Sequence, residues 1–154
     1  ENVRLPLDAG TDLPLAVKDF VALTKLKLVG LAPAARKMPA ELSGGMQKRA
    51  AIARAMALDP GILFLDEPSA GLDPVTSAGL DELIKGLARD SGITFVIVTH
   101  ELSSIYAIAD RVIMLDARTR TILAEGQPRT LRDEATDPWV RQFFHRQAAP
   151  APAT

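Results

Sequence analysis

The chain has 154 residues, of which 47% are hydrophobic, and its 18 basic and 19 acidic residues leave a formal net charge of −1. This balance argues against nucleic acid as the main partner, because a surface that follows phosphates normally carries a clear basic excess. The absence of cysteine excludes a disulfide framework, a thiolate metal site and a cysteine nucleophile. Apolar runs such as residues 95–98 are far too short to span a bilayer.

The first sixty residues predict helices and turns. Residues 1–14 show no sustained period and are expected to form turns or an irregular lead-in. A helix is expected over Leu15–Val29, with Gly30 as its stop, and a short helical or turn segment over residues 33–39. Ser43 is a good N-cap for a helix that runs to about Leu58. In the helix expected over Leu15–Val29, the apolar positions at helical spacing are Val17, Phe20, Val21 and Leu28.

From Gly61 onward the pattern predicts an α/β arrangement. Ile62–Leu65 and Thr94–Val98 are continuous apolar runs, as expected for strands buried on both faces of a parallel sheet. Between them Pro74–Arg89 has the pattern of a crossover helix, with Asp73 as its N-cap. The sequence therefore predicts a strand-helix-strand unit.

The later elements are predicted to be shorter. They comprise a helix over Leu102–Ala109, a hairpin of Arg111–Leu115 with Thr121–Ala124, a short helix from Pro128 that holds Leu131, and an amphipathic helix capped by Asp137 that carries Trp139, Val140, Phe143 and Phe144. Residues 147–154 are rich in Ala and Pro and are expected to be disordered.

Two adjacent carboxylates follow the first apolar strand. Asp66 and Glu67 lie where that strand ends, which in open parallel sheets is the edge where ligands bind. Adjacent strand residues point to opposite faces, so the two carboxylates are expected to have different tasks. A purely structural alternative is that both carboxylates only cap the next turn. Two carboxylates directly after four apolar residues make that alternative the weaker one.

Ser43, Gly44 and Gly45 at a helix start form a natural anion site, because free backbone N–H groups and the positive end of the helix dipole meet there. For these three residues alone, an ordinary serine cap with two flexible glycines is the better explanation. Met46 follows them and cannot donate a hydrogen bond through its side chain. The helix has a basic face formed by Lys48, Arg49 and Arg54, which is expected to be solvated, and a contact near the anion site is the less favoured alternative.

Longer strings decide between these alternatives. Leu42–Arg49 (L-S-G-G-M-Q-K-R), Ile62–Pro68 and Ser69–Asp73 resemble the signature, Walker B and D-loop series of an ABC-type ATPase. The commonest form of that signature has Gln where this chain has Met46, a departure that leaves the backbone and Ser43 contacts to phosphate intact. The implied fold is the helical subdomain plus the later strands of a P-loop ATPase core, with a C-terminal hairpin and helices.

The resemblance also implies roles and cofactors. Asp66 would hold Mg²⁺, Glu67 would polarise the water that attacks the γ-phosphate of ATP, and His100 would be the switch histidine. ATP held by the opposite subunit would be bound by Leu42, Ser43, Gly44, Gly45, Met46 and Asp73. Asp73 would also keep its role as a helix cap.

A phosphate-binding loop, G-x-x-x-x-G-K-[ST], does not occur in this sequence. The resemblance therefore implies the later part of a nucleotide-binding domain, divided into a helical subdomain at 1–60, the remaining catalytic core at 61–146 and a tail at 147–154. We expect the chain by itself to be inactive and not to bind MgATP measurably. We also expect uncovered apolar faces to promote self-association.

Three details resemble the ATPase subunit of Mla-type, or mammalian-cell-entry, lipid transporters: Gly44–Met46, Lys27–Leu31 and Pro138–Phe144. The implied partners are a second ATPase subunit and a transmembrane permease, at the cytoplasmic face of the inner membrane, with membrane contact only through the permease. The alternatives are an ABC ATPase of another transporter subgroup, a non-transport ABC ATPase, and a noncatalytic scaffold.

Overall fold

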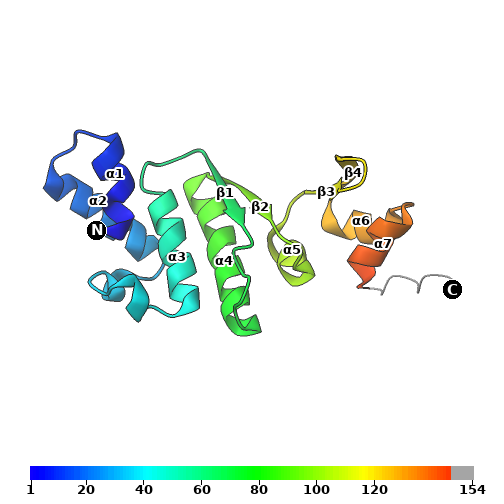
Figure 1. The fold of residues 1–154 in the computed structure, drawn as a ribbon, viewed down its shortest axis with the longest axis horizontal. Coiled ribbons are helices and arrows are strands. Elements are labelled where there is room, and N and C mark those ends of the chain that lie inside the picture. The colour runs from blue at the N-terminus through cyan, green and yellow to red at the C-terminus, as the bar shows by residue number, and fades with distance from the viewer. Residues whose placement is uncertain (147–154) are drawn as a thin grey trace. The chain divides into compact units, whose positions relative to one another are not determined.

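The computed structural model describes residues 1–146, and these form two compact units: residues 1–99, and a second unit that begins at His100. Figure 1 labels the helices and strands of both units. The expected division at residue 60 falls inside the first unit, and it stays a proposal about the organisation of a larger domain. Residues 147–154, predicted to form a disordered tail, lie outside the described residues.

The N-terminal residues are helical, so the prediction of an irregular lead-in is wrong. A 3-10 turn, η1, spans Asn2–Arg4, and helix α1 spans Leu5–Gly10. A proline at the second position of α1 is tolerated because the first N–H groups of a helix have no partner within the helix. Arg4 adds ion pairs to Asp8 at 3.0 Å and to Asp19 at 2.5 Å.

Helix α2 spans Leu15–Leu28, and Gly30 ends it in the left-handed conformation with φ of 75°, as predicted. Its apolar stripe does not face the core. Phe20 is 71% exposed, whereas Lys25 is only 8% exposed and pairs with Asp59. The long stem of a lysine can be buried among apolar neighbours when a carboxylate receives its ammonium group.

Two 3-10 turns, η2 (Ala32–Ala34) and η3 (Pro39–Glu41), lead into helix α3, which spans Gly44–Ala55. This helix is shorter than expected, and it is followed by a turn over residues 56–58 and then by Asp59, which takes a left-handed φ of 50°. The helical core of the first unit lies where α2, α3 and η1 meet. Its buried side chains include Val3, Val29, Leu31, Ile52 and Met56.

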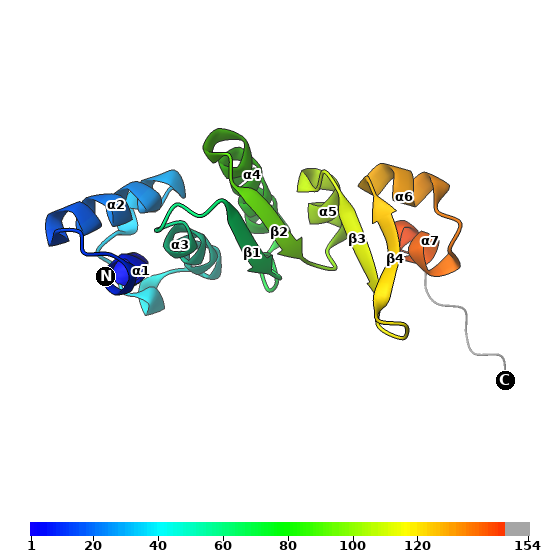
Figure 2. The same cartoon turned by 90° about the horizontal axis from the view of Figure 1, so that it is seen from above.

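Strands β1 (Ile62–Asp66) and β2 (Thr94–Val98) pair in parallel and are joined by helix α4 (Pro74–Ser91), as predicted. Figure 2 shows α4 along one face of the pair. Burial on both strand faces was expected, and this is wrong for the described residues, because the other face has no covering layer. Its exposed side chains are Ile62, Phe64, Val96 and Val98.

The second unit contains α5 (Leu102–Ile108), β3 (Val112–Asp116), β4 (Thr121–Gly126), α6 (Pro128–Glu134) and α7 (Pro138–His145). Strands β3 and β4 form the predicted antiparallel hairpin. The core consists of Ile105, Leu131, Val140 and Phe144. Among the described residues, no helix combines the length and the apolar character that crossing a bilayer requires.

Candidate functional site

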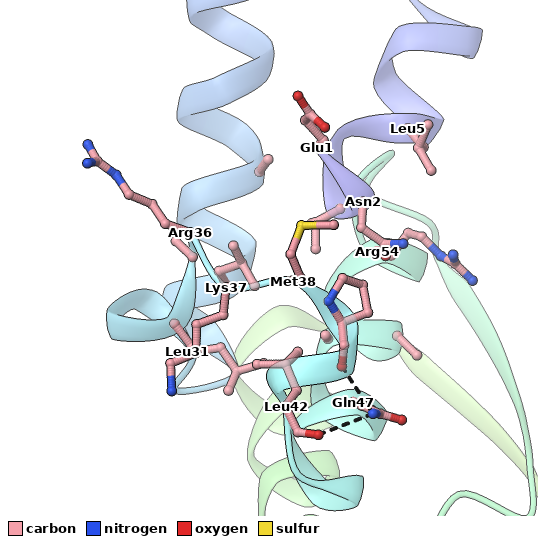
Figure 3. A pocket seen from close by; sticks show the side chains of 18 of the residues that line it. Glu1, Asn2, Leu5, Leu31, Arg36, Lys37, Met38, Leu42, Gln47 and Arg54 are labelled. Atoms are coloured by element: carbon pink, nitrogen blue, oxygen red, sulfur yellow. Dashed lines mark hydrogen bonds between the residues drawn. The ribbon is translucent and has the colours of Figure 1, made fainter.

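The N-terminus of α3 presents the expected anion-binding elements. Ser43 is the N-cap, and its Oγ accepts a hydrogen bond from the N–H of Met46 at 3.4 Å. Gly44 and Gly45 are the first two helical residues, so their N–H groups have no partner within the helix. The side chain of Gln47 is held by the segment that precedes this helix, because its Nε2 donates to the carbonyls of Pro39 and Leu42, each at 3.1 Å (Figure 3).

Gly45 also allows α3 to approach the start of α4 very closely. A Cβ atom at position 45 would lie 2.5 Å from Cγ2 of Thr76. Carbon atoms in good contact are about 3.5–4.0 Å apart, so no side chain fits there without movement. At Gly44 the corresponding atom would meet Leu72 at 3.5 Å, an ordinary contact. The packing of α3 against α4 therefore requires a glycine at position 45.

Asp73 caps α4, as predicted. Its Oδ1 accepts from the N–H groups of Val75 at 3.1 Å and Thr76 at 3.0 Å, and its Oδ2 accepts from the Thr76 hydroxyl at 2.5 Å. The hydroxyl and backbone N–H of Thr76 hold the pKa of Asp73 below its usual value. Thr76 thus contacts the D-loop carboxylate through its oxygen and lies against the signature helix through its methyl group.

Asp66 and Glu67 stand at the carboxyl end of β1, where the sequence predicts them. Asp66 is an exposed strand residue, whereas Glu67 lies just beyond the strand with a left-handed φ of 44°. That conformation costs a non-glycine residue about 1–3 kcal/mol, so the surrounding structure must hold it. The N–H of Glu67 donates to the carbonyl of Val98 at 2.9 Å, and Oε2 accepts from the Thr99 hydroxyl at 3.3 Å.

The basic residues of α3 correct an expectation, because two of them contact the protein backbone. Lys48 Nζ donates to the carbonyl of Glu67 at 3.2 Å. Arg49 Nη2 donates to the carbonyl of Gly79 at 3.1 Å. Both side chains are half-buried, and only Arg54 of the three is exposed as predicted. Where α3 packs against its neighbours, long basic side chains donate hydrogen bonds to backbone carbonyl oxygens, which leucine or alanine could not do.

The structure brings most of the predicted residues together in the first unit. The N-terminus of α3, the cap residue Asp73 and the carboxylates of β1 all belong to it. His100 comes after Thr99, two residues beyond the last residue of β2, has an exposed side chain, and is the first residue of the second unit.

Sequence reasoning did not identify Lys48, Thr76 and Thr99 as parts of this site. A usable signal exists for Thr99, because β1 and β2 pair with Asp66 opposite Val98, and the next residues along both strands are Glu67 and Thr99. Lys48 and Thr76 carry no such signal, because their contacts depend on how α3 packs against α4.

The donor set fits ATP and Mg²⁺. The end of α3 offers a hydroxyl and free backbone N–H groups to phosphate oxygens, with two glycines that permit a close approach. Asp66 offers an exposed carboxylate, and Mg²⁺ bound with nucleotide typically takes one or two carboxylates, phosphate oxygens and several waters.

A cavity of about 930 Å³ opens within the first sixty residues. Its apolar wall includes Val3, Ala22, Leu26, Leu31 and Met38, and its basic residues are Arg36, Lys37 and Arg54. Figure 3 shows it from close by, with Gln47 and Leu42 at one side. The cavity involves η1, α2, α3 and the 3-10 turns, and it is separate from the carboxylates at the end of β1.

Comparison with known proteins agrees with this geometry. The ABC transporter family model matches residues 17–70. CbiO1 of Clostridium perfringens, part of the ABC transporter complex CbiONQ, aligns with 86% of this chain and 51% of its own, at a TM-score of 0.77 and 29% identity. The chain therefore belongs to the ABC transporter ATPases and has the α/β fold of part of their P-loop core, as the motifs predict.

Within that family the chain resembles the Mla type. The Intermembrane phospholipid transport system ATP-binding protein MlaF of Escherichia coli K12 is 43% identical over 94% of this chain. A protein named for ribonucleotide transport in Mycobacterium leprae, Mkl, is 39% identical over the same share. The chain spans about half the length of such relatives, 52% of MlaF and 41% of Mkl.

Proposed function

We propose that this chain is the signature and Walker B part of an ATP-hydrolysing subunit that drives an ABC transporter of phospholipid or another lipid between envelope membranes. The observation that carries the proposal is the shared placement of two chemical elements in one unit. A glycine-rich helix N-terminus suited to phosphate and a carboxylate pair suited to metal and water are joined by a direct contact between Lys48 and Glu67.

Each element has a separate role in this proposal. Asp66 would hold Mg²⁺ for ATP bound to the same subunit, and that ion would neutralise charge that develops on the phosphates. The Glu67 carboxylate would orient and deprotonate the attacking water, and His100 would contact the γ-phosphate. The Thr99 hydroxyl supports the role of Glu67, because it donates to Oε2 and so restricts where the carboxylate points.

A second copy of the subunit would supply the other half of each site. Backbone N–H groups of Gly44 and Gly45, with the Ser43 hydroxyl and flanking contacts from Leu42 and Met46, would bind the γ-phosphate of ATP held by the opposite subunit. Asp73 would lie at the interface while it caps α4. Such a dimer explains why one chain carries parts of two different sites.

A permease would be the membrane partner, and we place its contact at the cavity in the first sixty residues. An apolar wall with Arg36, Lys37 and Arg54 suits an amphipathic segment that carries acidic residues. This arrangement would put the subunit at the cytoplasmic face of the inner membrane. The similarity to MlaF favours phospholipid as the cargo.

The test of the catalytic assignment is Glu67→Gln in the intact ATPase subunit. Amide for carboxylate removes the base but keeps the size, so ATP turnover should fall roughly 10²- to 10⁴-fold while ATP binding persists. Glu82→Gln, the same change at an exposed position of α4, is the matched control and should leave turnover unchanged. ATP turnover by the Glu67→Gln enzyme within twofold of the parent would refute the assignment of Glu67 as the base.

The cargo is tested separately, with the intact subunit and its permease reconstituted in vesicles. We expect phospholipid to stimulate ATP turnover, and ribonucleotides to have no effect. The opposite response would favour the cargo named for the mycobacterial relative.

A further inference from the structure

The backbone of Glu67 is held from two sides. Its N–H donates to Val98 of β2 at 2.9 Å, which fixes the amide at the edge of the sheet. Its carbonyl oxygen accepts two hydrogen bonds, from the N–H of Ala70 at 3.2 Å and from Lys48 Nζ at 3.2 Å. A carbonyl oxygen has two lone pairs, so these two donors use its full capacity.

These contacts matter because the conformation of Glu67 is unfavourable by itself. A non-glycine residue with φ of 44° needs support from neighbouring groups. The direction of a side chain follows from the backbone angles of its own residue, so a shift in φ or ψ would re-aim the carboxylate. A hydrogen bond from a charged donor is among the stronger ones available to a carbonyl oxygen.

Lys48 differs from the other two hydrogen-bond partners of the Glu67 backbone because it lies outside the strand pair and the loop that follows β1. Val98 and Ala70 belong to the neighbouring strand and to the loop that follows Glu67, whereas Lys48 lies on α3, whose N-terminal residues are Gly44 and Gly45. One helix therefore carries both the phosphate-binding N-terminus and a contact to the backbone of the residue that we assign as the base.

We propose that Lys48 is a positioning residue for Glu67, which ties the placement of this subunit's base to the position of the signature helix. The proposal rests on the function proposed above. In a dimer, α3 meets the ATP of the opposite subunit, so a movement of α3 on that ATP would be passed to the carbonyl of Glu67. Ordering of the base would then depend on occupancy of the neighbouring site.

The alternative is that Lys48 only adds stability to the packing between α3 and β1. The two explanations differ in what they predict for ATP. A structural role would change melting temperature or protein yield. A positioning role would lower kcat while KM for ATP stays the same, and a different side chain with a donor at a similar distance would restore kcat.

The experiment compares three variants of the intact subunit. Lys48→Met keeps the length and apolar stem but removes the donor, and Lys48→Arg keeps a charged donor. Lys27→Met, the same change at an exposed position of α2, is the control. We expect Lys48→Met to lower kcat about tenfold, or about 1.4 kcal/mol of activation free energy, with KM within twofold. The arginine variant should recover most of the loss, and the control should match the parent.

A second measurement is independent of ATP turnover. Lys48 anchors the same carbonyl oxygen that accepts from the N–H of Ala70, so loss of the lysine should free this carbonyl to move and loosen the turn after Glu67. We expect faster amide hydrogen exchange across residues 66–72 in Lys48→Met, parent-like exchange in Lys48→Arg, and no change in Lys27→Met.

Three results would overturn the proposal: unchanged exchange across residues 66–72 in Lys48→Met, a kcat within twofold of the parent, or an arginine variant no better than the methionine variant. Failure of the proposed function looks different. If the parent subunit does not hydrolyse ATP, or Glu67→Gln retains turnover, the ATPase assignment is lost. The exchange measurement would still decide whether Lys48 holds this turn.

Discussion

The close approach of α3 and α4 gives a sharp prediction for Gly45→Ala. The added methyl carbon would lie 2.5 Å from Cγ2 of Thr76. Thr76 cannot rotate that methyl group away without moving its hydroxyl, which donates a hydrogen bond to Oδ2 of Asp73 at 2.5 Å. Either α3 shifts away from α4, or the D-loop residue loses this hydrogen bond.

The expected magnitude follows from two opposing effects. Overpacking at a close contact typically costs about 1–3 kcal/mol. Replacing glycine by alanine in a helix returns about 0.5–1 kcal/mol. The difference between these ranges centres near about 1 kcal/mol, so we expect Gly45→Ala to lower the free energy of unfolding by about 1 kcal/mol, because the clash outweighs the gain in helix propensity.

The same structure supplies a rescue and a control. Thr76→Ser removes the clashing methyl group and keeps the hydroxyl for Asp73, so the Gly45→Ala and Thr76→Ser double variant should regain most of the lost stability. Gly86→Ala makes the same change in α4, where a new Cβ meets no atom within 4 Å. It should raise stability by about 0.5–1 kcal/mol.

The assay is urea unfolding of the intact subunit, followed by circular dichroism, for the parent, both single variants, the double variant and the control. A double variant whose stability equals the sum of the single effects would refute the reasoning, because sites that touch should couple. A Gly45→Ala protein at least as stable as the parent would refute it as well.

Two further predictions concern the helix caps and the second unit. Asp73→Ala should destabilise the protein at neutral pH. Because folding lowers the pKa of Asp73, the difference in free energy of unfolding between variant and parent should shrink as the pH falls below about 3.9. A difference in stability that does not depend on pH would contradict this. Phe144→Ala should cost about 3–5 kcal/mol in thermal unfolding, whereas Trp139→Ala, at 53% exposure on the same helix, should cost little; equal losses would argue against the core described here.

Local chemistry made several elements predictable from sequence. Asp73 and Asp137 each precede a proline at a helix start, and the structure shows both capping the helix that follows. A cap depends on a few consecutive residues, so it needs no knowledge of tertiary packing. The parallel strand pair and the hairpin followed from short apolar runs between turn residues.

Contacts between distant segments were not predictable in this way. Lys25 is buried and its ammonium group pairs with Asp59, which lies 34 positions later in the chain. Lys48 and Arg49 were expected to be solvated, yet each reaches a backbone carbonyl, 19 and 30 positions away. Helical periodicity shows which residues share a face, but it does not show which face packs inward or what a long basic side chain will meet.

The uncovered face of the β1–β2 pair has a practical consequence for protein engineering. Side chains alternate along a strand, so Phe64 and Val98 can be replaced by polar residues without changing those that meet α4. Threonine at both positions would keep β-propensity and reduce the apolar surface available for aggregation. A resurfaced domain of this kind would suit structural work on the signature helix in isolation, while the unaltered strands remain the reference for studies with the partners.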